Sequence, residues 1–231
     1  MARNQMRAAR GVTAAVVLIV MGQQALAADL AQAGSVPQAV ASVTEAPSPW
    51  QIRLRALGVV THDAGYVNAV PGSDLSYSNT VTPELDISYF FTDNIAAELI
   101  LGTTYANIMG QGTIGELENI GKVWLLPPTL TLQYHFTNFG GFRPYVGAGV
   151  NYTIFYNQDV GSANALKVKN TFGTALQVGF DYLVDRHWGV NFDVKKLFLN
   201  TDFDVTVDGA KLTGKASLDP WLIGAGVTYR F

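Results

Sequence analysis

The chain has 231 residues, of which 14% are charged, 48% are hydrophobic and none is cysteine. Soluble domains carry roughly 25% charged residues, so an ordinary soluble domain is disfavoured, and a disulfide framework is excluded. The formal net charge of −3 argues against nucleic acid as a partner.

The first 27 residues are typical of a secretory signal peptide. We expect cleavage before Ala28, and a retained anchor helix is the alternative. Residues 28–48 are rich in Ala, Gln, Val, Ser and Pro without any period, which predicts a flexible periplasmic leader. The signal consists of a basic region with Arg3, Arg7 and Arg10, a short apolar segment from Gly11 to Gly22 and the cleavage site Ala25-Leu26-Ala27.

From residue 49 onward, apolar residues alternate with polar or small ones, which predicts β-strands with two different faces. Short turns at 92–94, 137–141 and 184–187 alternate with long connections. The predicted connections are 61–76, 106–122, 157–169 and 208–214. The eight predicted strands cover residues 50–60, 81–91, 95–105, 124–136, 142–154, 172–182, 188–194 and 221–231.

The last strand indicates where such a sheet resides. Every second residue from Trp221 to Phe231 is apolar, and the chain ends in Phe. Backbone polar groups find no partners in lipid, so membrane strands must form a closed barrel. We therefore predict an all-β, eight-stranded antiparallel transmembrane β-barrel over 49–231. A soluble lipocalin-like barrel is the alternative, but it would not need so apolar a C-terminal strand.

The barrel prediction places the protein in the Gram-negative outer membrane, with both mature termini in the periplasm. Short turns face the periplasm and long connections face outward in such barrels. Outer-membrane lipid and lipopolysaccharide are then its surroundings, and the barrel assembly machinery is an expected partner. Tyr229 and Phe231 resemble the C-terminal signal that this machinery reads.

An eight-stranded barrel is only wide enough for its own side chains, so an aqueous pore is not expected. Alternation directs eight charged residues inward, where opposite charges can pair. A polar plug that fills the lower lumen is favoured over a catalytic or conducting role. Its predicted members are Arg53, Arg55, Glu84, Asp86, Glu98, Arg143, Asp181 and Asp193.

Above the plug, four inward apolar residues predict an apolar funnel: Leu57, Val59, Ile100 and Phe155. Pro127 and Pro128 open the fourth strand, and proline has no N–H for a neighbouring strand. The pair predicts a lateral exit between the third and fourth strands. The alternative is that the prolines only mark the point where a loop ends and the strand begins, without a gap. Lys195 and Lys196 interrupt the alternation, which predicts a β-bulge near the outer interface, where lysines reach lipid phosphates.

Enzymatic interpretations have little support. His62 and Asp63 with Ser73 or Ser76 form the only candidate nucleophile set at the outer rim. No metal-ligand spacing is present, and no cofactor is expected.

Further evidence comes from six segments within about residues 50–231, which are residues 92–99, 126–130, 142–153, 177–182, 218–221 and 226–231. These segments resemble the OmpW family of outer-membrane proteins. The resemblance implies an eight-stranded barrel that carries small hydrophobic ligands across the outer membrane. A structural or receptor-type barrel without transport is the alternative, since family members can also serve as bacteriocin receptors.

Overall fold

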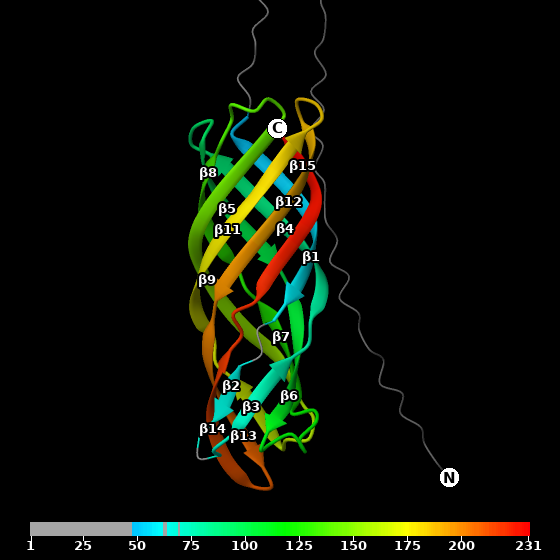
Figure 1. Ribbon diagram of the computed structural model, residues 1–231, viewed down its shortest axis with the longest axis vertical. Helices are drawn as coiled ribbons and strands as arrows, with labels where there is room; N and C mark the ends of the chain where they lie inside the picture. The colour runs from blue at the N-terminus through cyan, green and yellow to red at the C-terminus, as the bar shows by residue number, and fades with distance from the viewer. Residues whose placement is uncertain (1–47, 62–63, 69) are drawn as a thin grey trace, which may run out of the picture. The chain divides into compact units, whose positions relative to one another are not determined.

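The computed structural model describes residues 48–61, 64–68 and 70–231 (Figure 1). Within these residues the chain forms fifteen β-strands, and none of the described segments is a helix long and apolar enough to cross a membrane. The predicted signal peptide, nearly all of the predicted leader, and His62 and Asp63 lie outside the described residues.

Eight strands form a closed antiparallel barrel. Each pairs with its neighbours in the sheet, and the additional pairing of β11 with β9 closes the ring. The predicted fold class is therefore confirmed. The barrel strands are β1 (Trp50–Val60), β4 (Thr80–Phe90), β5 (Ile95–Gly102), β8 (Thr129–His135), β9 (Phe142–Val160), β11 (Thr171–Leu183), β12 (Trp188–Phe198) and β15 (Trp221–Arg230).

The period of two in the sequence determines which side chains face out. Along β1 and β4, buried polar residues alternate with exposed apolar ones. Leu54 is 56% exposed and Val81 is 78% exposed, whereas Arg53, which precedes Leu54 in β1 and pairs with Asp86 of β4, is fully buried. The barrel wall is therefore apolar outside and polar inside, which is the arrangement that a bilayer requires.

Three short turns join barrel strands at one end, here called the turn end: 91–94, 136–141 and 184–187. In the last of them the Asp185 carboxylate accepts hydrogen bonds from the backbone N–H groups of His187 and Trp188, each at 2.7 Å. The bond from Trp188 is the main cause that lowers the pKa of Asp185 below its ordinary value, and the bond from His187 adds to it.

The opposite, extended end contains further strands where long connections were predicted. That part of the prediction is wrong, because these segments also alternate and pair. One sheet continues from β9 in the order β9-β7-β6-β3, and a second has the order β10-β13-β14-β2. The added strands are β2 (Gly65–Val67), β3 (Ser73–Tyr77), β6 (Thr104–Gly112), β7 (Gly121–Leu126), β10 (Ala165–Val168), β13 (Asn200–Val207) and β14 (Ala210–Ser217).

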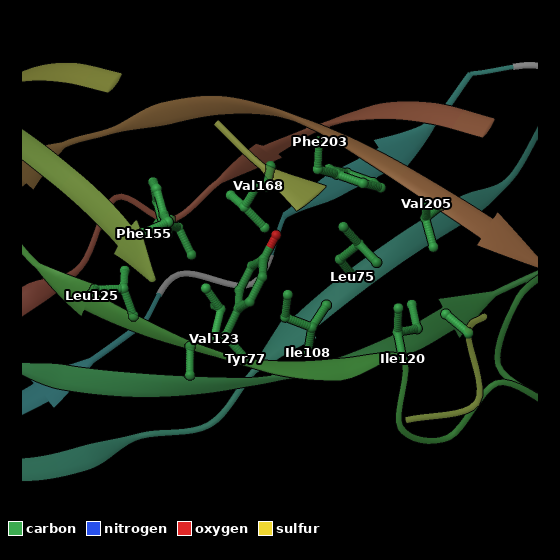
Figure 2. Packing of buried hydrophobic residues seen from close by; sticks show 14 of the residues in the cluster. Leu75, Tyr77, Ile108, Ile120, Val123, Leu125, Phe155, Val168, Phe203 and Val205 are labelled. Atoms are coloured by element: carbon green, nitrogen blue, oxygen red, sulfur yellow. The ribbon is translucent and has the colours of Figure 1, made fainter. Parts of the chain in front are cut away.

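The interior of the extended end is apolar. Figure 2 shows side chains from both sheets, among them Leu75, Ile108 and Phe203, packed into one cluster. Polar residues such as Lys167 and Asp202 are exposed on these strands. The extended end therefore has an apolar interior and a polar exterior, the reverse of the turn end. This arrangement is expected of a part that projects into water, because burial removes apolar side chains from water.

This exchange corrects the predicted bulge at Lys195 and Lys196. The register of β12 runs without a shift past both lysines, against β15 on one side and β11 on the other. Lys195 faces inward and is buried, and Leu197 also faces inward and is buried. The inward and outward positions of β12 therefore alternate without interruption. What changes between Lys195 and Leu197 is the interior, which is polar at Lys195 and apolar at Leu197.

The third and fourth predicted strands are each interrupted. Residues predicted as one strand are divided into β5 and β6 at Thr103, and into β7 and β8 at Pro127 and Pro128. The two interruptions lie across from each other in the wall, because Ile100 pairs with Thr129 and Thr104 pairs with Leu125.

Candidate functional site: the lumen and the interrupted wall

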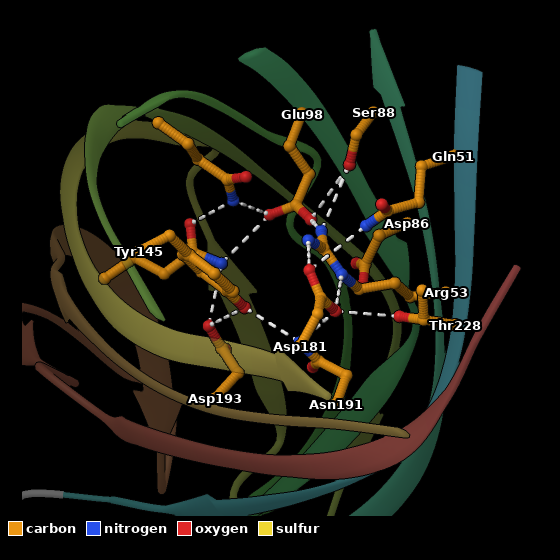
Figure 3. Close-up of polar contacts among 12 residues, drawn as sticks. Gln51, Arg53, Asp86, Ser88, Glu98, Tyr145, Asp181, Asn191, Asp193 and Thr228 are labelled. Atoms are coloured by element: carbon orange, nitrogen blue, oxygen red, sulfur yellow. Dashed lines mark hydrogen bonds and ion pairs between the residues drawn. The ribbon is translucent and has the colours of Figure 1, made fainter. Parts of the chain in front are cut away.

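The lower lumen contains a network of buried charges around Arg53 (Figure 3). The Arg53 guanidinium binds both oxygens of Asp181, through Nε at 3.0 Å and Nη2 at 2.6 Å. Its Nη1 pairs with the Glu98 carboxylate and donates to Ser88 Oγ at 3.1 Å. One cation from β1 thus links carboxylates on β5 and β11 across the barrel.

A second cluster of charges lies nearer the extended end. Arg55 contacts Glu84 at 2.9 Å and Asp193 at 3.4 Å, and also pairs with Asp86. Lys195 contacts the same Glu84 at 2.8 Å and the same Asp193 at 2.9 Å. Two cations and three carboxylates therefore form one connected group.

Amide and hydroxyl groups complete the network. Gln177 Nε2 donates to Glu98 at 2.9 Å and to Asp193 at 2.8 Å, which joins the two clusters. The Tyr145 hydroxyl donates to Asp193 at 3.0 Å. Room for that ring comes from Gly179, where an added Cβ would lie 2.6 Å from the Tyr145 hydroxyl oxygen. Large polar side chains thus fill the cross-section where a small residue is paired with them on the neighbouring strand.

All eight residues of the predicted plug lie on inward-facing positions of the barrel strands, and seven of them are buried. Arg143 is half-buried and lies closer to the turn end. Lys195, Gln177 and Tyr145 also belong to this network but were not among the predicted plug residues. Lys195 was predicted at the outer interface, and its buried contacts with two carboxylates correct that placement.

An apolar cavity adjoins the charged network on the side toward the extended end. It is called the lower cavity here, and directions up the barrel run from the turn end to the extended end. Its floor is formed by the Glu84 and Lys195 side chains, and hydroxyl groups such as Thr82 and Thr153 also line it. Three predicted funnel residues contribute to its wall, while Phe155 lines the cavity above. The apolar wall of this lower cavity includes Leu57, Val59, Ile100, Leu125, Leu197 and Leu222.

A second cavity lies between the two sheets of the extended end. Its lining is apolar apart from Tyr77 and Thr201. The Thr201 hydroxyl donates to the Lys169 carbonyl at 2.5 Å, and the Tyr77 hydroxyl donates to the Ala64 carbonyl at 3.2 Å. Both hydroxyl hydrogens are therefore directed to backbone acceptors, and this upper cavity suits hydrocarbon better than water.

The lower cavity reaches the interrupted part of the wall, since Thr103 and Pro127 both line it. Between the pairs Ile100–Thr129 and Thr104–Leu125, these described strands form no ladder pair. A side-chain bond partly bridges the gap, from Thr103 Oγ1 to the Leu125 carbonyl at 3.1 Å.

The other side of the proline pair is closed. The Tyr152 N–H donates to the Pro128 carbonyl at 3.1 Å. The Asn151 amide donates to the carbonyls of Pro127 and Pro128 at 3.1 and 3.2 Å. The break is thus confined to the side that faces β5 and β6.

Lys196, which follows the buried Lys195 in β12, faces outward. Its ammonium group lies 5.0 Å from the centre of the Trp221 ring and donates to the Asp219 carbonyl. The predicted contact with lipid phosphate stays a prediction for Lys196.

The candidate nucleophile set is only partly described. Ser73 Oγ accepts a hydrogen bond from the Val67 N–H at 2.9 Å, and Ser76 Oγ accepts one from Gln111 at 3.2 Å. Both serines therefore contribute to local structure. In the part of the chain that the structure describes, no three His, Cys, Asp or Glu side chains are grouped to hold a metal ion.

The sequence profile of the OmpW family matches residues 50–231. An outer-membrane protein of Sinorhizobium fredii, y4mB, is 60% identical over the whole of both chains. The dibenzothiophene metabolism operon protein PahQ of Pseudomonas aeruginosa is 30% identical, over 80% of this chain and 89% of its own.

Solved outer-membrane structures share the fold. The crystal structure of OprG from Pseudomonas aeruginosa aligns with a TM-score of 0.74 and 24% identity, over 80% of this chain and 97% of OprG. The NMR structure of outer membrane protein AlkL in DMPC bilayers aligns with a TM-score of 0.65 and 30% identity, over 80% of this chain and 90% of AlkL.

Proposed function

The chain belongs to the OmpW family of outer-membrane proteins, and from this premise we propose that it admits small hydrophobic molecules through the outer membrane. Such molecules enter the apolar interior of the extended end from outside the cell. They then leave sideways, through the interrupted wall, into the lipid of the membrane.

The observation that carries the proposal is the position of the lower cavity. This cavity is bounded on one side by Glu84 and Lys195 of the charged network, and Thr103 and Pro127 of the interrupted wall also line it. An apolar molecule that crossed the network would have to displace buried ion pairs, which is very costly. The lateral route passes side-chain hydrogen bonds of Thr103, to the Leu125 carbonyl and to the Tyr156 hydroxyl, and no buried ion pair. It continues from one apolar environment into another.

The relative PahQ supports the class of substrate. By its name, that protein belongs to an operon for the metabolism of dibenzothiophene, which is an apolar aromatic compound. For the present chain, the apolar lining of the two cavities is consistent with molecules of comparable polarity.

Replacement of Pro127 and Pro128 by valine tests the lateral exit. Successive N–H groups of a strand point to opposite sides, so one of the two new N–H groups can donate toward β5, and such a hydrogen bond contributes about 1 kcal/mol. The gap should then close, and uptake of a radiolabelled hydrocarbon by cells should fall while folding is unchanged. Pro144→Val is the matched control, because Pro144 lies in β9 at the turn end, away from the gap.

Three measurements make the outcome decisive. The heat-modifiable band on gels reports the folded barrel, amide hydrogen exchange reports whether the ladder has extended, and uptake is compared with that of cells lacking the gene. Wild-type cells that take up no more than the deletion strain would refute transport and leave the structural or receptor role. An extended ladder with normal uptake would refute only the lateral exit.

A further inference from the structure

The two apolar cavities are stacked, and they meet at two residues. Of all the described side chains, only Ala106 and Leu218 line both the upper and the lower cavity. Both are buried, with exposures of 4% and 6%. Ala106 lies on β6, and Leu218 lies in the short linker between β14 and β15. The boundary between the cavities is therefore formed by one small and one large apolar side chain.

The linker that carries Leu218 has an unusual backbone. Asp219 has a φ of 26°, which lies in the left-handed region that non-glycine residues rarely adopt. Such conformations persist only when the surrounding structure holds them, and they gather at functional sites. The strain at Asp219 thus requires an explanation in the contacts of the linker.

Those contacts fasten the linker to β12 and to the residue that follows it. The Leu218 N–H donates to the Leu199 carbonyl at 3.0 Å, and the Leu199 N–H donates to Asp219 Oδ1 at 2.6 Å. The Lys196 ammonium donates to the Asp219 carbonyl. At the following residue of the linker, the Pro220 carbonyl accepts a hydrogen bond from the Leu197 N–H at 3.2 Å. Leu218 is therefore held in a fixed position at the boundary between the cavities.

The side chain opposite is small where its neighbours are large. Along the inner face of β6, Ala106 is followed by Ile108, and the paired strand β7 presents Val123 and Leu125 inward. These three neighbours belong to the apolar cluster of Figure 2. Ala106 is smaller than these three neighbours, and together with Leu218 it lines both cavities, so a larger residue here would fill space between them.

We propose that Ala106 and Leu218 form the neck between the two cavities, and that the Leu218 side chain sets the width of the molecules that pass. The inference rests on the proposed function, since it places a size filter on the same route. Linear chains present a smaller cross-section than branched or cyclic hydrocarbons, so the neck favours linear molecules.

A reversible block tests the neck directly. The natural chain has no cysteine, so Leu218→Cys introduces a single thiol into the full-length protein. An apolar alkyl methanethiosulfonate should form a mixed disulfide with it, whereas a charged reagent of similar size should react more slowly. We expect the modified protein to lose most hydrocarbon uptake and to recover it when a reductant removes the alkyl group. Recovery in the same molecules shows that the loss is not a folding defect.

Leu212→Cys is the matched control, because Leu212 lines only the upper cavity. Its modification should leave most of the uptake in place. Leu218→Ala provides the complementary test: uptake of a branched or cyclic hydrocarbon should rise relative to a linear one, and Leu212→Ala should leave that ratio unchanged.

The outcomes separate the two proposals. If wild-type cells take up hydrocarbon but modified Leu218→Cys does so equally well, the neck is refuted and the passage stands. The neck is likewise refuted if mass spectrometry finds no mixed disulfide on folded Leu218→Cys, or if modification at positions 218 and 212 has equal effects. Wild-type uptake no greater than that of the deletion strain would refute the passage and the neck together.

Discussion

At the scale of single residues, the lumen is governed by the cost of burying charge. Arg53 and Arg55 are almost completely inaccessible to solvent, and so are the carboxylates that they contact. A buried ion is tolerated only when opposite charges and hydrogen bonds surround it. The charges in the lumen therefore depend on one another, and removal of one leaves the others uncompensated.

Arg53→Ala should destabilise the barrel strongly. The substitution leaves Asp181 and Glu98 without their shared cation, and loss of one partner of a buried pair costs about 3–5 kcal/mol. Urea unfolding in lipid vesicles measures the change. Arg143→Ala is the control, since Arg143 is half-buried near the turn end. Equal, small effects of the two substitutions would contradict the structural role of Arg53.

Gly179→Ala should destabilise the barrel through crowding. The new Cβ would lie 2.6 Å from the Phe192 carbonyl oxygen and 2.6 Å from the Tyr145 hydroxyl oxygen. Overpacking of this kind costs about 1–3 kcal/mol. At Gly58 the nearest atom would be 3.6 Å away, so Gly58→Ala should be tolerated in the same unfolding assay. A tolerated Gly179→Ala would show that the Tyr145 ring moves aside freely.

At the scale of elements, the sequence was informative wherever one face met lipid. The alternation of β1 and β4 predicted inward charges because Arg53 and Arg55 could not face lipid, and both arginines lie buried inside the barrel. The strands beyond the membrane were missed, because their apolar face points inward and their turns look like loop sequence. Lys195 and Leu197 both occupy inward positions of β12, the first polar and the second apolar. From the sequence alone, this change was wrongly interpreted as a bulge.

The turn between β11 and β12 should weaken at acidic pH. The pKa of Asp185 is lowered by hydrogen bonds from the N–H groups of Trp188 and His187, so the folded turn favours the ionised carboxylate. This stabilisation is complete above the ordinary pKa of aspartate, about 3.9, and is lost as the pH falls through the lowered pKa. Protection factors of the Trp188 and His187 amides should fall in that range. In Asp185→Asn they should not depend on pH there, and an identical pH dependence would contradict the assignment.

The candidate site shows a similar limit of prediction. Pro127 and Pro128 could be predicted to break a ladder because the missing N–H group is a property of the residue itself. The stacked cavities could not be predicted, since Ala106 and Leu218 are far apart in the sequence and meet only through the pairing of distant strands. The strained backbone at Asp219 likewise has no signal in an ordinary Leu-Asp-Pro segment.

At the scale of the whole molecule, one barrel serves two surroundings. The turn-end half is apolar outside and charged inside, and the extended half is polar outside and apolar inside. Lys195 is the last charged residue of β12 on the inner face, and the apolar lining begins at Leu197. The change of lining within one strand places the apolar lower cavity directly against the charged network, and the interrupted wall at Thr103 and Pro127 lines that same cavity. This is the place where the proposed lateral exit would open.

Assembly of this molecule is expected to depend on its last residue. Phe231 is exposed, contacts the Tyr229 ring at 4.9 Å between ring centres, and donates its N–H to the Trp50 carbonyl at 3.1 Å. The Phe231 carbonyl also accepts a hydrogen bond from the Ser48 N–H at 3.0 Å. The two terminal hydrogen bonds contribute about 2 kcal/mol together, so deletion of Phe231 should lower the refolding of purified protein into phospholipid vesicles only slightly. In cells, the folded, heat-modifiable fraction in the outer membrane should fall, because the assembly machinery loses its signal.

Phe139→Ala controls for the loss of an exposed aromatic residue, since Phe139 lies in a turn at the same end and is 61% exposed. Its folded fraction in cells should match the wild type. An unchanged folded fraction after deletion of Phe231 would refute the signal. An equal loss in vesicles and in cells would instead assign the effect to the pairing of β1 with β15. The first and last barrel strands pair there, and Phe231 bonds to Trp50 at the end of that pairing.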